Sequence, residues 1–353
     1  GGGDDGALAK GSGVEDVILR EPATAKACTA RDFPAQACRS VSLSMQGWRN
    51  HMEDRSSATP RVRNYAMFGV YDGHGGWQAA EAVSERLPEL VRGAKGAMPA
   101  EHERIFREAF IAADDELRAD GVRSGTTACV ALVGAEHYVV ANLGDCRCVL
   151  SRNGRQVALS RDHKPCRRTE RRRIEQAGLT VTESNQEVSR ILSSVSNMSL
   201  AVSRTLGDFD FKTAKHLHPG QQAVSCIPEL VVEERSGDDD FLVLASDGVW
   251  DVMENWEVVT FLNARLSSGK RDIRGAAEAL LDECLERESQ DNMTVLLVDL
   301  SGAAVGRGST GDLEDEGEDV DLDCPTRDGT PAAPTDGGDT TRGASMELKA
   351  GSE

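Results

Sequence analysis

Apolar and polar positions along the first 300 residues form short strand-like runs and longer helical stripes. Two apolar runs, at 41–50 and 65–72, predict strands on either side of a polar connection. The segments at 77–92 and 100–118 follow, and the second repeats its apolar residues every three or four positions, so that two helices are expected. The start of the chain therefore predicts a pair of strands followed by a pair of helices.

The remainder of this region repeats the same alternation. Further strands are predicted at 126–133, 137–144, 146–154, 241–248 and 292–300, and further helices at 167–178, 255–266 and 272–286. Asn153 and Gly154 predict a hairpin turn, whereas residues 179–203 are polar and give no clear prediction. Groups of antiparallel strands with helices inserted in pairs favour an α+β fold over a doubly wound parallel sheet.

Composition divides the 353 residues into three parts. Residues 1–35 are rich in Gly, Ala and Asp and have little periodicity, so we expect a flexible N-terminal segment. Residues 36–300 hold the periodic pattern and form the expected domain. Residues 301–353 contain 13 acidic and 4 basic residues and few large apolar ones, which predicts an acidic disordered tail.

Charge and cysteine usage narrow the classes of partner. A net charge of −19 argues against nucleic acid, because no basic field would attract its phosphates. The nine cysteines are odd in number and lack paired C-x-x-C spacing, so we expect a reduced intracellular protein, cytoplasmic or nuclear, without a zinc module. No apolar run approaches the roughly 18 residues that a membrane span needs.

The segment FGVYDGHGGWQAA, at 68–80, carries the first candidate chemistry. Asp72, Gly73 and His74 lie where an apolar run gives way to a helical pattern. Glycines there are also typical of a tight turn, and Gln78 replaces the last glycine of a dinucleotide-binding motif. An Asp, a His and open backbone carbonyls at one point favour a site that holds a hard cation and moves a proton.

Other acidic residues also stand at the ends of predicted strands. Asp145 and Asp247 each follow an apolar run, Asp251 comes one turn later, and Asp291 precedes the last run. Any one of them could be a turn former or a helix cap. Together, carboxylates at the ends of neighbouring strands predict an oxygen-rich cation site.

Eight motifs, in chain order, resemble those of the metal-dependent PP2C (PPM) family of serine/threonine protein phosphatases. They are GWRNHMEDRSS, FGVYDGHGG, SGTTA, VANLGDCR, SRDHKP, LAVSRTLGDFDFK, LASDGVWDVM and DNMTVLLV. The resemblance covers about residues 36–300. It implies a four-layer α-β-β-α sandwich, in which two antiparallel sheets are flanked by helices.

The resemblance also implies two Mn²⁺ or Mg²⁺ ions and their ligands. The implied metal-binding residues are Glu53, Asp54, Asp72, Gly73, Asp247 and Asp291. Asp72 would bridge the two ions, Gly73 would contribute its backbone carbonyl, and Asp54 would act through water. Asp145 and Asp251, with Asp247, match positions that hold a third, looser metal in the family.

The implied reaction is hydrolysis of phosphoserine and phosphothreonine by a monomer acting on phosphorylated proteins. A water activated by both metals would be the nucleophile, Arg49 would bind the phosphate, and His74 would protonate the leaving oxygen. His163 and Arg204 also lie in these motifs, and we interpret them as mainly structural. The alternatives are an inactive relative that binds partners without turnover, and an unrelated Mg²⁺-dependent nuclease or nucleotide hydrolase.

The sequence departs from the family pattern at two places. Cys146 replaces a common serine beside Asp145, and we hypothesise that this thiol makes the activity sensitive to oxidation. Met198 replaces a common glycine, and residues 179–200 look rewritten. In the family this region forms a flap that influences substrate choice, so unusual substrate recognition is expected.

Overall fold

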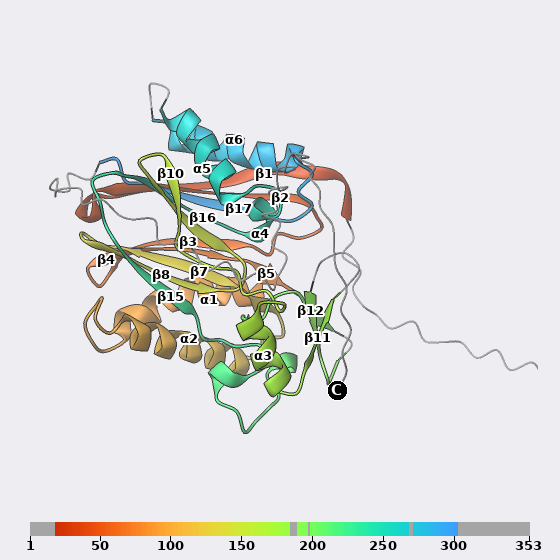
Figure 1. The fold of residues 1–353 in the computed structure, drawn as a ribbon. Coiled ribbons are helices and arrows are strands. Elements are labelled where there is room, and N and C mark those ends of the chain that lie inside the picture. The colour runs from red at the N-terminus through yellow and green to blue at the C-terminus, as the bar shows by residue number, and fades with distance from the viewer. Residues whose placement is uncertain (1–17, 184–188, 197, 268–270, 303–353) are drawn as a thin grey trace, which may run out of the picture.

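The computed structural model describes residues 18–183, 189–196, 198–267 and 271–302. Two antiparallel sheets pack face to face, and helices cover both outer faces (Figure 1). The layers therefore follow the order helix, sheet, sheet, helix. The α+β sandwich that the motifs imply is confirmed.

Two large sheets form the centre of the molecule. The first sheet has six strands in the order β1 (Ile18–Phe33), β2 (Cys38–Arg49), β17 (Met293–Asp299), β16 (Asp239–Ala245), β9 (Arg147–Arg152) and β10 (Arg155–Ala158). The second sheet has five strands in the order β15 (Glu229–Glu234), β8 (His137–Leu143), β7 (Ala128–Val133), β4 (Tyr65–Tyr71) and β3 (Arg55–Val62). Neighbouring strands within both sheets pair in antiparallel register.

Two small sheets, six α-helices and the 3₁₀ helices Pro34–Gln36, Phe209–Phe211 and Pro219–Gln221 complete the described structure. The small sheets are β11 (Thr180–Glu183), β12 (Ser189–Leu192) and β13 (Ser199–Leu200), and β14 (Leu206–Gly207), β6 (Gly125–Thr126) and β5 (Gly73–His74). The α-helices in the described residues are α1 (Gln78–Gly93), α2 (His102–Ala119), α3 (Arg168–Gln176), α4 (Asp247–Trp250), α5 (Asn255–Leu266) and α6 (Ile273–Glu286). No helix among the described residues is both long and apolar enough to cross a membrane.

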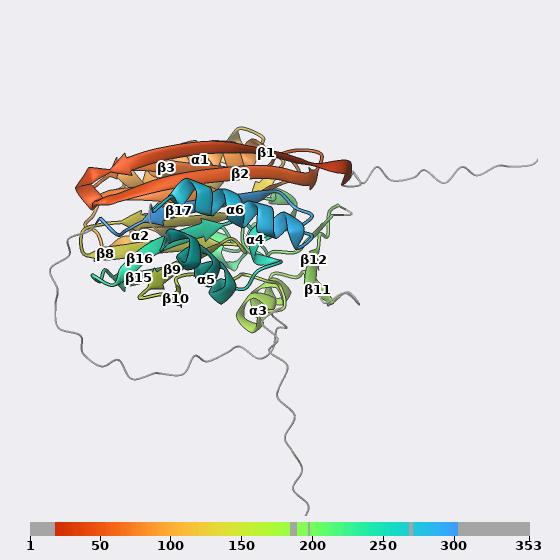
Figure 2. The ribbon, with the colours of Figure 1, turned by 90° about the horizontal axis from the view of Figure 1, so that it is seen from above.

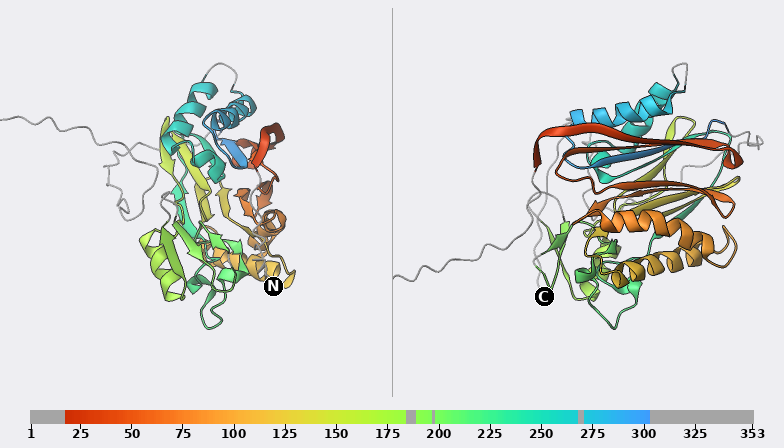
Figure 3. Two further views of the ribbon diagram at one scale, coloured as in Figure 1. Left: turned by 90° about the vertical axis from the view of Figure 1, so that its right-hand side faces the viewer. Right: turned by 180° about the vertical axis from the view of Figure 1, so that it is seen from behind.

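Three hydrophobic cores lie between the four layers. One core fills the space between the sheets and includes Phe68 and Leu242, which have no exposed surface. A second lies between the six-stranded sheet and helices α5 and α6, which Figure 2 shows from above. The third lies between the five-stranded sheet and helices α1 and α2. Figure 3 shows these two helices from behind. Burying one such large side chain contributes about 1.5–3 kcal/mol, so these layers form a firm support for the strand ends.

The N-terminal segment differs from the prediction of a flexible lead-in through residue 35. Residues 18–33 form β1, a long edge strand that pairs with β2 from Phe33 opposite Cys38 to Ile18 opposite Arg49. Most of its side chains are exposed, so β1 lacks the apolar alternation by which a strand is recognised. Residues 1–17 and 303–353 lie outside the described residues, so the expected disorder of the acidic tail stays a prediction.

Most of the predicted elements are found within a few residues of their expected bounds. The Asn153–Gly154 hairpin is confirmed, since both residues have positive φ (49° and 75°) between β9 and β10. The sequence did not predict β3 or β15, and the polar region at 179–203 contains the short strands β11, β12 and β13.

Candidate metal centre

Acidic residues from both large sheets meet at one end of the sandwich. Asp72 follows β4 and Asp145 follows β8 in the five-stranded sheet. In the six-stranded sheet, Asp247 begins helix α4 two residues after β16, and Asp291 precedes β17. Because β4 and β8 end, and β17 begins, at the same end of the sandwich, residues far apart in sequence become neighbours (Figure 1).

Three of these carboxylates form a compact cluster. Asp72, Asp145 and Asp247 each place one ligand atom so that all three atoms lie within 4.8 Å of one another. Carboxylate oxygens at this spacing are the donors that Mg²⁺ and Mn²⁺ prefer in proteins. The cluster includes Asp145, which the resemblance assigns only to a looser third ion.

Two of the cluster residues, Asp72 and Asp247, show the electrostatic signs of repulsion between like charges. Burial raises the pKa of Asp72 well above its usual range, and repulsion from Asp247 and other carboxylates raises it further. Burial and repulsion from Asp291 and Asp145 do the same to the pKa of Asp247. Like charges held this close favour either protonation or a bound cation.

Glu53 and Asp54 lie in the turn between β2 and β3, and they face different partners. The buried Asp54 carboxylate accepts a hydrogen bond from Ser246 Oγ at 2.7 Å, and burial raises its pKa to about 7. The backbone N–H of Glu53 donates to Asn292 Oδ1 at 2.8 Å, while Asn292 Nδ2 donates to the carbonyl of His51 at 2.9 Å. Asn292 therefore fixes this turn, a role that the sequence did not predict.

Gly73 allows the backbone to approach closely beside Asp72. A Cβ atom at this position would lie 2.6 Å from the backbone oxygen of Glu53 and 3.1 Å from the Cβ of Ala80. Such contacts would force the chain apart, so only glycine fits without a shift. Two segments that the resemblance assigns to metal binding are thus in direct backbone contact.

Arg49, at the end of β2, forms an ion pair with Asp291. Arg49 Nη2 lies 2.7 Å from Asp291 Oδ2, and each side chain is 33 % exposed. Burial raises the pKa of Asp291, and the Arg49 charge partly opposes this effect. The implied phosphate-binding group and an implied metal ligand therefore touch each other in this structure.

Asp145 has a basic partner from the SRDHKP motif. Lys164 Nζ donates to Asp145 Oδ2, and Asp145 is almost fully buried. Burial opposes charge on Lys164, but Asp145 and neighbouring carboxylates raise the lysine pKa above its usual range. Asp251 lies at the C-terminal end of α4, one turn after Asp247.

His74 has an acidic partner that the sequence did not predict. His74 Nε2 lies 2.7 Å from Asp208 Oδ2, with the histidine side chain 30 % exposed and that of Asp208 2 % exposed. Burial lowers the pKa of His74, but the charge and hydrogen bond of Asp208 outweigh it and raise the pKa overall. Asp208 belongs to the LAVSRTLGDFDFK motif, 134 residues away.

Two further motif residues, His163 and Arg204, each contact a glutamate outside the carboxylate cluster. His163 is fully buried, and its Nε2 lies 3.0 Å from Glu229 Oε2. Arg204 Nη2 lies 2.6 Å from Glu170 Oε1. These contacts agree with the interpretation of His163 and Arg204 as mainly structural.

Cys146 does not fit the oxidation hypothesis. Its side chain is fully buried, and its Sγ lies 3.1 Å from Thr127 Oγ1. Burial and the nearby Asp72 charge raise the thiol pKa well above its usual range. Because the thiolate is the form that is oxidised, this environment disfavours the reaction.

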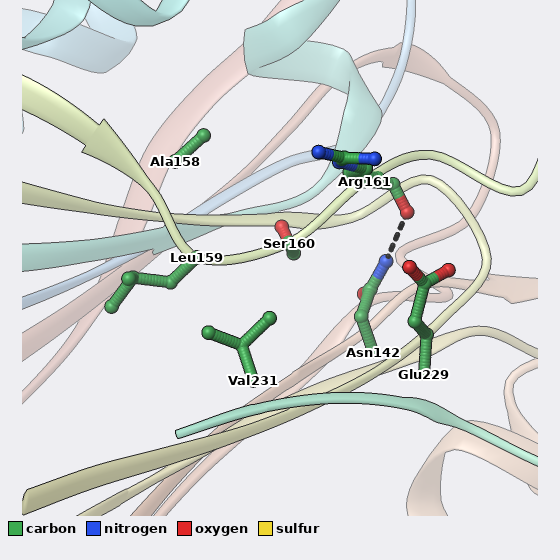
Figure 4. Close-up of a pocket in the computed structure, with 7 residues that line it drawn as sticks. All are labelled: Asn142, Ala158, Leu159, Ser160, Arg161, Glu229 and Val231. Atoms are coloured by element: carbon green, nitrogen blue, oxygen red, sulfur yellow. Dashed lines mark hydrogen bonds between the residues drawn. The ribbon is translucent and has the colours of Figure 1, made fainter. Parts of the chain in front are cut away.

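A cavity of about 280 Å³ lies elsewhere, between the edge strands β10 and β15 (Figure 4). Its lining residues are Asn142, Ala158, Leu159, Ser160, Arg161, Glu229 and Val231. Asn142 Nδ2 donates to the carbonyl of Arg161 at 3.0 Å. None of the clustered carboxylates lines it, so this cavity is separate from the candidate metal centre.

Comparisons with known proteins identify the family and agree with the fold. The family model "Protein phosphatase 2C" matches residues 39–293. Protein phosphatase 1B of Mus musculus is 38 % identical over 282 residues, which cover 74 % of this chain and 70 % of that protein. Probable protein phosphatase 2C 21 of Oryza sativa subsp. japonica is 35 % identical over 290 residues, covering 73 % and 82 %.

Solved structures show the same fold. A crystal structure of a phosphatase from Toxoplasma gondii superimposes with a TM-score of 0.68 at 24 % identity, covering 80 % of this chain and 98 % of that one. A serine-threonine phosphatase 2C from the same organism gives a TM-score of 0.66 at 23 % identity, covering 78 % and 99 %. At these identities the likeness supports the fold alone.

A sandwich with an acidic cluster at one end is consistent with a metal-dependent hydrolase, and the family model and the sequence matches specify the class. The chain belongs to the protein phosphatase 2C family. It is a protein serine/threonine phosphatase, a metal-dependent hydrolase whose family uses Mn²⁺ or Mg²⁺ and whose substrates are phosphoproteins. The predicted family and enzyme class are confirmed.

Proposed function

We propose that the acidic centre holds two Mn²⁺ or Mg²⁺ ions and hydrolyses phosphoserine and phosphothreonine there. The observation that carries this proposal is the cluster of Asp72, Asp145 and Asp247, whose ligand atoms lie within 4.8 Å of one another. Buried carboxylates this close repel one another unless a cation neutralises them. The raised pKa values of Asp72 and Asp247 fit such a cation site.

The neighbouring residues would supply the remaining oxygen donors. Asp72 would bridge the two ions, with Asp247 and Asp291 on one of them. Glu53 and the carbonyl of Gly73 would hold the other, and the close approach of Gly73 to Glu53 supports their shared role. Asp54, hydrogen-bonded to Ser246, would act through a water.

Hard cations at this centre, when bound, would lower the pKa of a shared water and neutralise charge on the phosphoryl oxygens. Arg49 would bind two phosphoryl oxygens, because its guanidinium offers two parallel N–H donors. Its side chain is 33 % exposed and is held at the centre by Asp291. His74 follows Gly73 directly and would give a proton to the departing serine or threonine oxygen.

A third ion is a separate prediction. Asp145, Asp247 and Asp251 would be its ligands, and Asp145 and Asp247 already belong to the cluster. Lys164 neutralises Asp145 in this structure, so an ion bound there would have to displace the lysine ammonium. We therefore expect this ion to be the most weakly held of the three.

The test is hydrolysis of a phosphothreonine peptide with Mn²⁺, with Mg²⁺ and with EDTA. We expect turnover with either metal, none with EDTA, and a loss of at least about 100-fold in Asp247→Asn. Asp238→Asn, which makes the same change at an exposed turn, should keep full activity. Turnover that persists in EDTA or in Asp247→Asn would overturn the proposal.

A further inference from the structure

A hydrogen-bonded pair outside the acidic cluster, His74 and Asp208, sets how the histidine ring is held. The pair joins strand β5 to the turn that follows β14, and its Nε2 to Oδ2 distance is 2.7 Å. One ring nitrogen is thereby engaged. Among the residues that the structure describes, Nδ1 of His74 has no hydrogen-bond partner.

The main chain at Asp208 is left-handed, and its side chain does not cap the helical turn that follows. Asp208 adopts a left-handed conformation (φ 53°, ψ 45°), which is uncommon for a residue with a side chain. It precedes the short helical turn Phe209–Phe211, where an aspartate would usually cap the helix N-terminus. Its carboxylate makes no such capping bond and contacts His74 instead. A capping role therefore does not explain the residue.

Gly125 provides the space for the pair. It lies opposite His74 in the β5–β6 pairing. A Cβ atom at Gly125 would lie 2.1 Å from Asp208 Oδ2 and 2.4 Å from His74 Nε2. Any other residue at position 125 would push the carboxylate and the ring apart, so this glycine is required by the pair itself.

Helix α2 anchors the turn that presents Asp208. The buried Asp114 on α2 accepts hydrogen bonds from Gly207 N at 2.8 Å and from Lys212 Nζ at 2.7 Å. Both donors flank Asp208 in sequence. The turn whose carboxylate holds His74 is thus fixed by the buried ion pair of Asp114 and Lys212, an arrangement that narrows the range of orientations open to the ring.

We propose that Asp208 is a positioning residue, which holds the His74 ring by Nε2 and leaves Nδ1 as the nitrogen that serves the substrate. This inference rests on the proposed function of the centre. In the cleavage step, water bonds to phosphorus while the bond from phosphorus to the threonine oxygen breaks. That oxygen keeps the electron pair and takes the Nδ1 proton, and His74 stays bonded to Asp208 through Nε2–H.

Two substrates with different leaving groups separate this role from a structural one. A threonine alkoxide is a strong base and needs a proton to depart, whereas p-nitrophenolate departs without one. With saturating Mn²⁺, we expect Asp208→Ala to lower kcat for a phosphothreonine peptide by about 100-fold with little change in KM. The kcat for p-nitrophenyl phosphate should fall less than about 5-fold.

Three further variants sharpen the test. Asp208→Asn retains an acceptor oxygen, so its phosphothreonine activity should lie between those of Asp208→Ala and the parent. Adding Asp208→Ala to His74→Ala should cause no further loss, because both changes disable one unit. Asp210→Ala, an exposed aspartate two residues away in the same turn, should behave like the parent.

The outcomes distinguish this inference from the proposed function. Metal-dependent hydrolysis of both substrates by the parent supports the metal centre, whatever Asp208 does. Equal losses on both substrates in Asp208→Ala or in Asp208→Asn, with an unchanged melting temperature, would overturn the positioning role. So would multiplicative losses in the double variant.

Discussion

Arg49 Nη2, at the end of β2, lies 2.7 Å from Oδ2 of Asp291, which precedes β17. The residue expected to bind the substrate phosphate thus forms an ion pair with a residue expected to bind metal. The contact keeps the guanidinium at the acidic centre before substrate binds. It also offsets part of the desolvation penalty that burial imposes on the charged form of Asp291. Substrate binding would exchange a carboxylate partner of Arg49 for a phosphate.

Replacing this arginine should weaken substrate binding more than metal binding. For Arg49→Lys we expect KM for a phosphothreonine peptide to rise about 10- to 100-fold, because a bidentate charged contact becomes a single one. Arg39→Lys is the matched control, since Arg39 pairs with Asp299 at the opposite end of β17. Steady-state kinetics give KM for both variants. An unchanged KM in Arg49→Lys would contradict the phosphate-binding role of Arg49.

Neutralising one clustered carboxylate should stabilise the metal-free protein while it impairs the enzyme. Burial and repulsion raise the pKa of Asp247, so its charged form is unfavourable in the metal-free fold. We expect Asp247→Asn to raise the unfolding free energy in EDTA by about 1–3 kcal/mol. Thermal unfolding with and without Mn²⁺ measures this, with Asp238→Asn as the control. A lower melting temperature for Asp247→Asn in EDTA would contradict the predicted repulsion at Asp247.

Adding a methyl group at Gly73 should weaken metal binding, because it would displace the backbone of a neighbouring segment. The added Cβ of Gly73→Ala would meet the Glu53 oxygen at 2.6 Å and displace that segment. We expect Mn²⁺ affinity to fall at least about 10-fold, because ligand geometry at a cation site tolerates little displacement. Gly93→Ala, at the end of α1 with open space around its Cβ, should leave affinity unchanged. Equal affinity in both variants would show that Gly73 has no such role.

The contact between the buried His163 and the partly exposed Glu229 predicts part of the stability loss in acid. The hydrogen bond from His163 lowers the pKa of Glu229 to about 2, against the effect of burial and with help from Arg167. Between about pH 4.5 and 2 the unfolded chain therefore binds a proton that the native state excludes, so stability falls as the pH falls.

The variant Glu229→Gln tests this account of acid stability. Urea unfolding at pH 5 and pH 3 should show a smaller pH-dependent loss of unfolding free energy in Glu229→Gln than in the parent. Glu234→Gln, at the exposed end of the same strand, should follow the parent. A loss in Glu229→Gln as large as that of the parent would contradict the prediction.

The elements that the sequence predicted share a clear apolar pattern. β4, β7 and β17 are buried along their whole length, and each reads as a continuous apolar run. The long strand β1 does not, since its side chains are mostly exposed and it contains Pro22, which an edge strand tolerates. Its order comes from pairing with β2, a tertiary contact that has no local signal.

The residues of the candidate site also fall into two groups, those that the sequence could predict and those that it could not. Asp72, Asp145, Asp247 and Asp291 could be predicted because strand ends and glycines mark them in the sequence. Asp208 could not, because its role depends on a left-handed turn and on the missing Cβ of Gly125. The role of Asn292 could not be predicted either, because it accepts a hydrogen bond from the backbone of Glu53, which is distant in sequence.

The central claim is that these carboxylates hold two divalent ions, and a calorimetric titration of the metal-free protein with Mn²⁺ tests it most directly. We expect two ions to bind tightly to the parent, and tight binding to be lost in Asp72→Asn, because Asp72 would bridge both. The exposed control Asp238→Asn should bind as the parent does. Absence of Mn²⁺ binding by a folded parent protein, or unchanged binding by Asp72→Asn, would contradict the account.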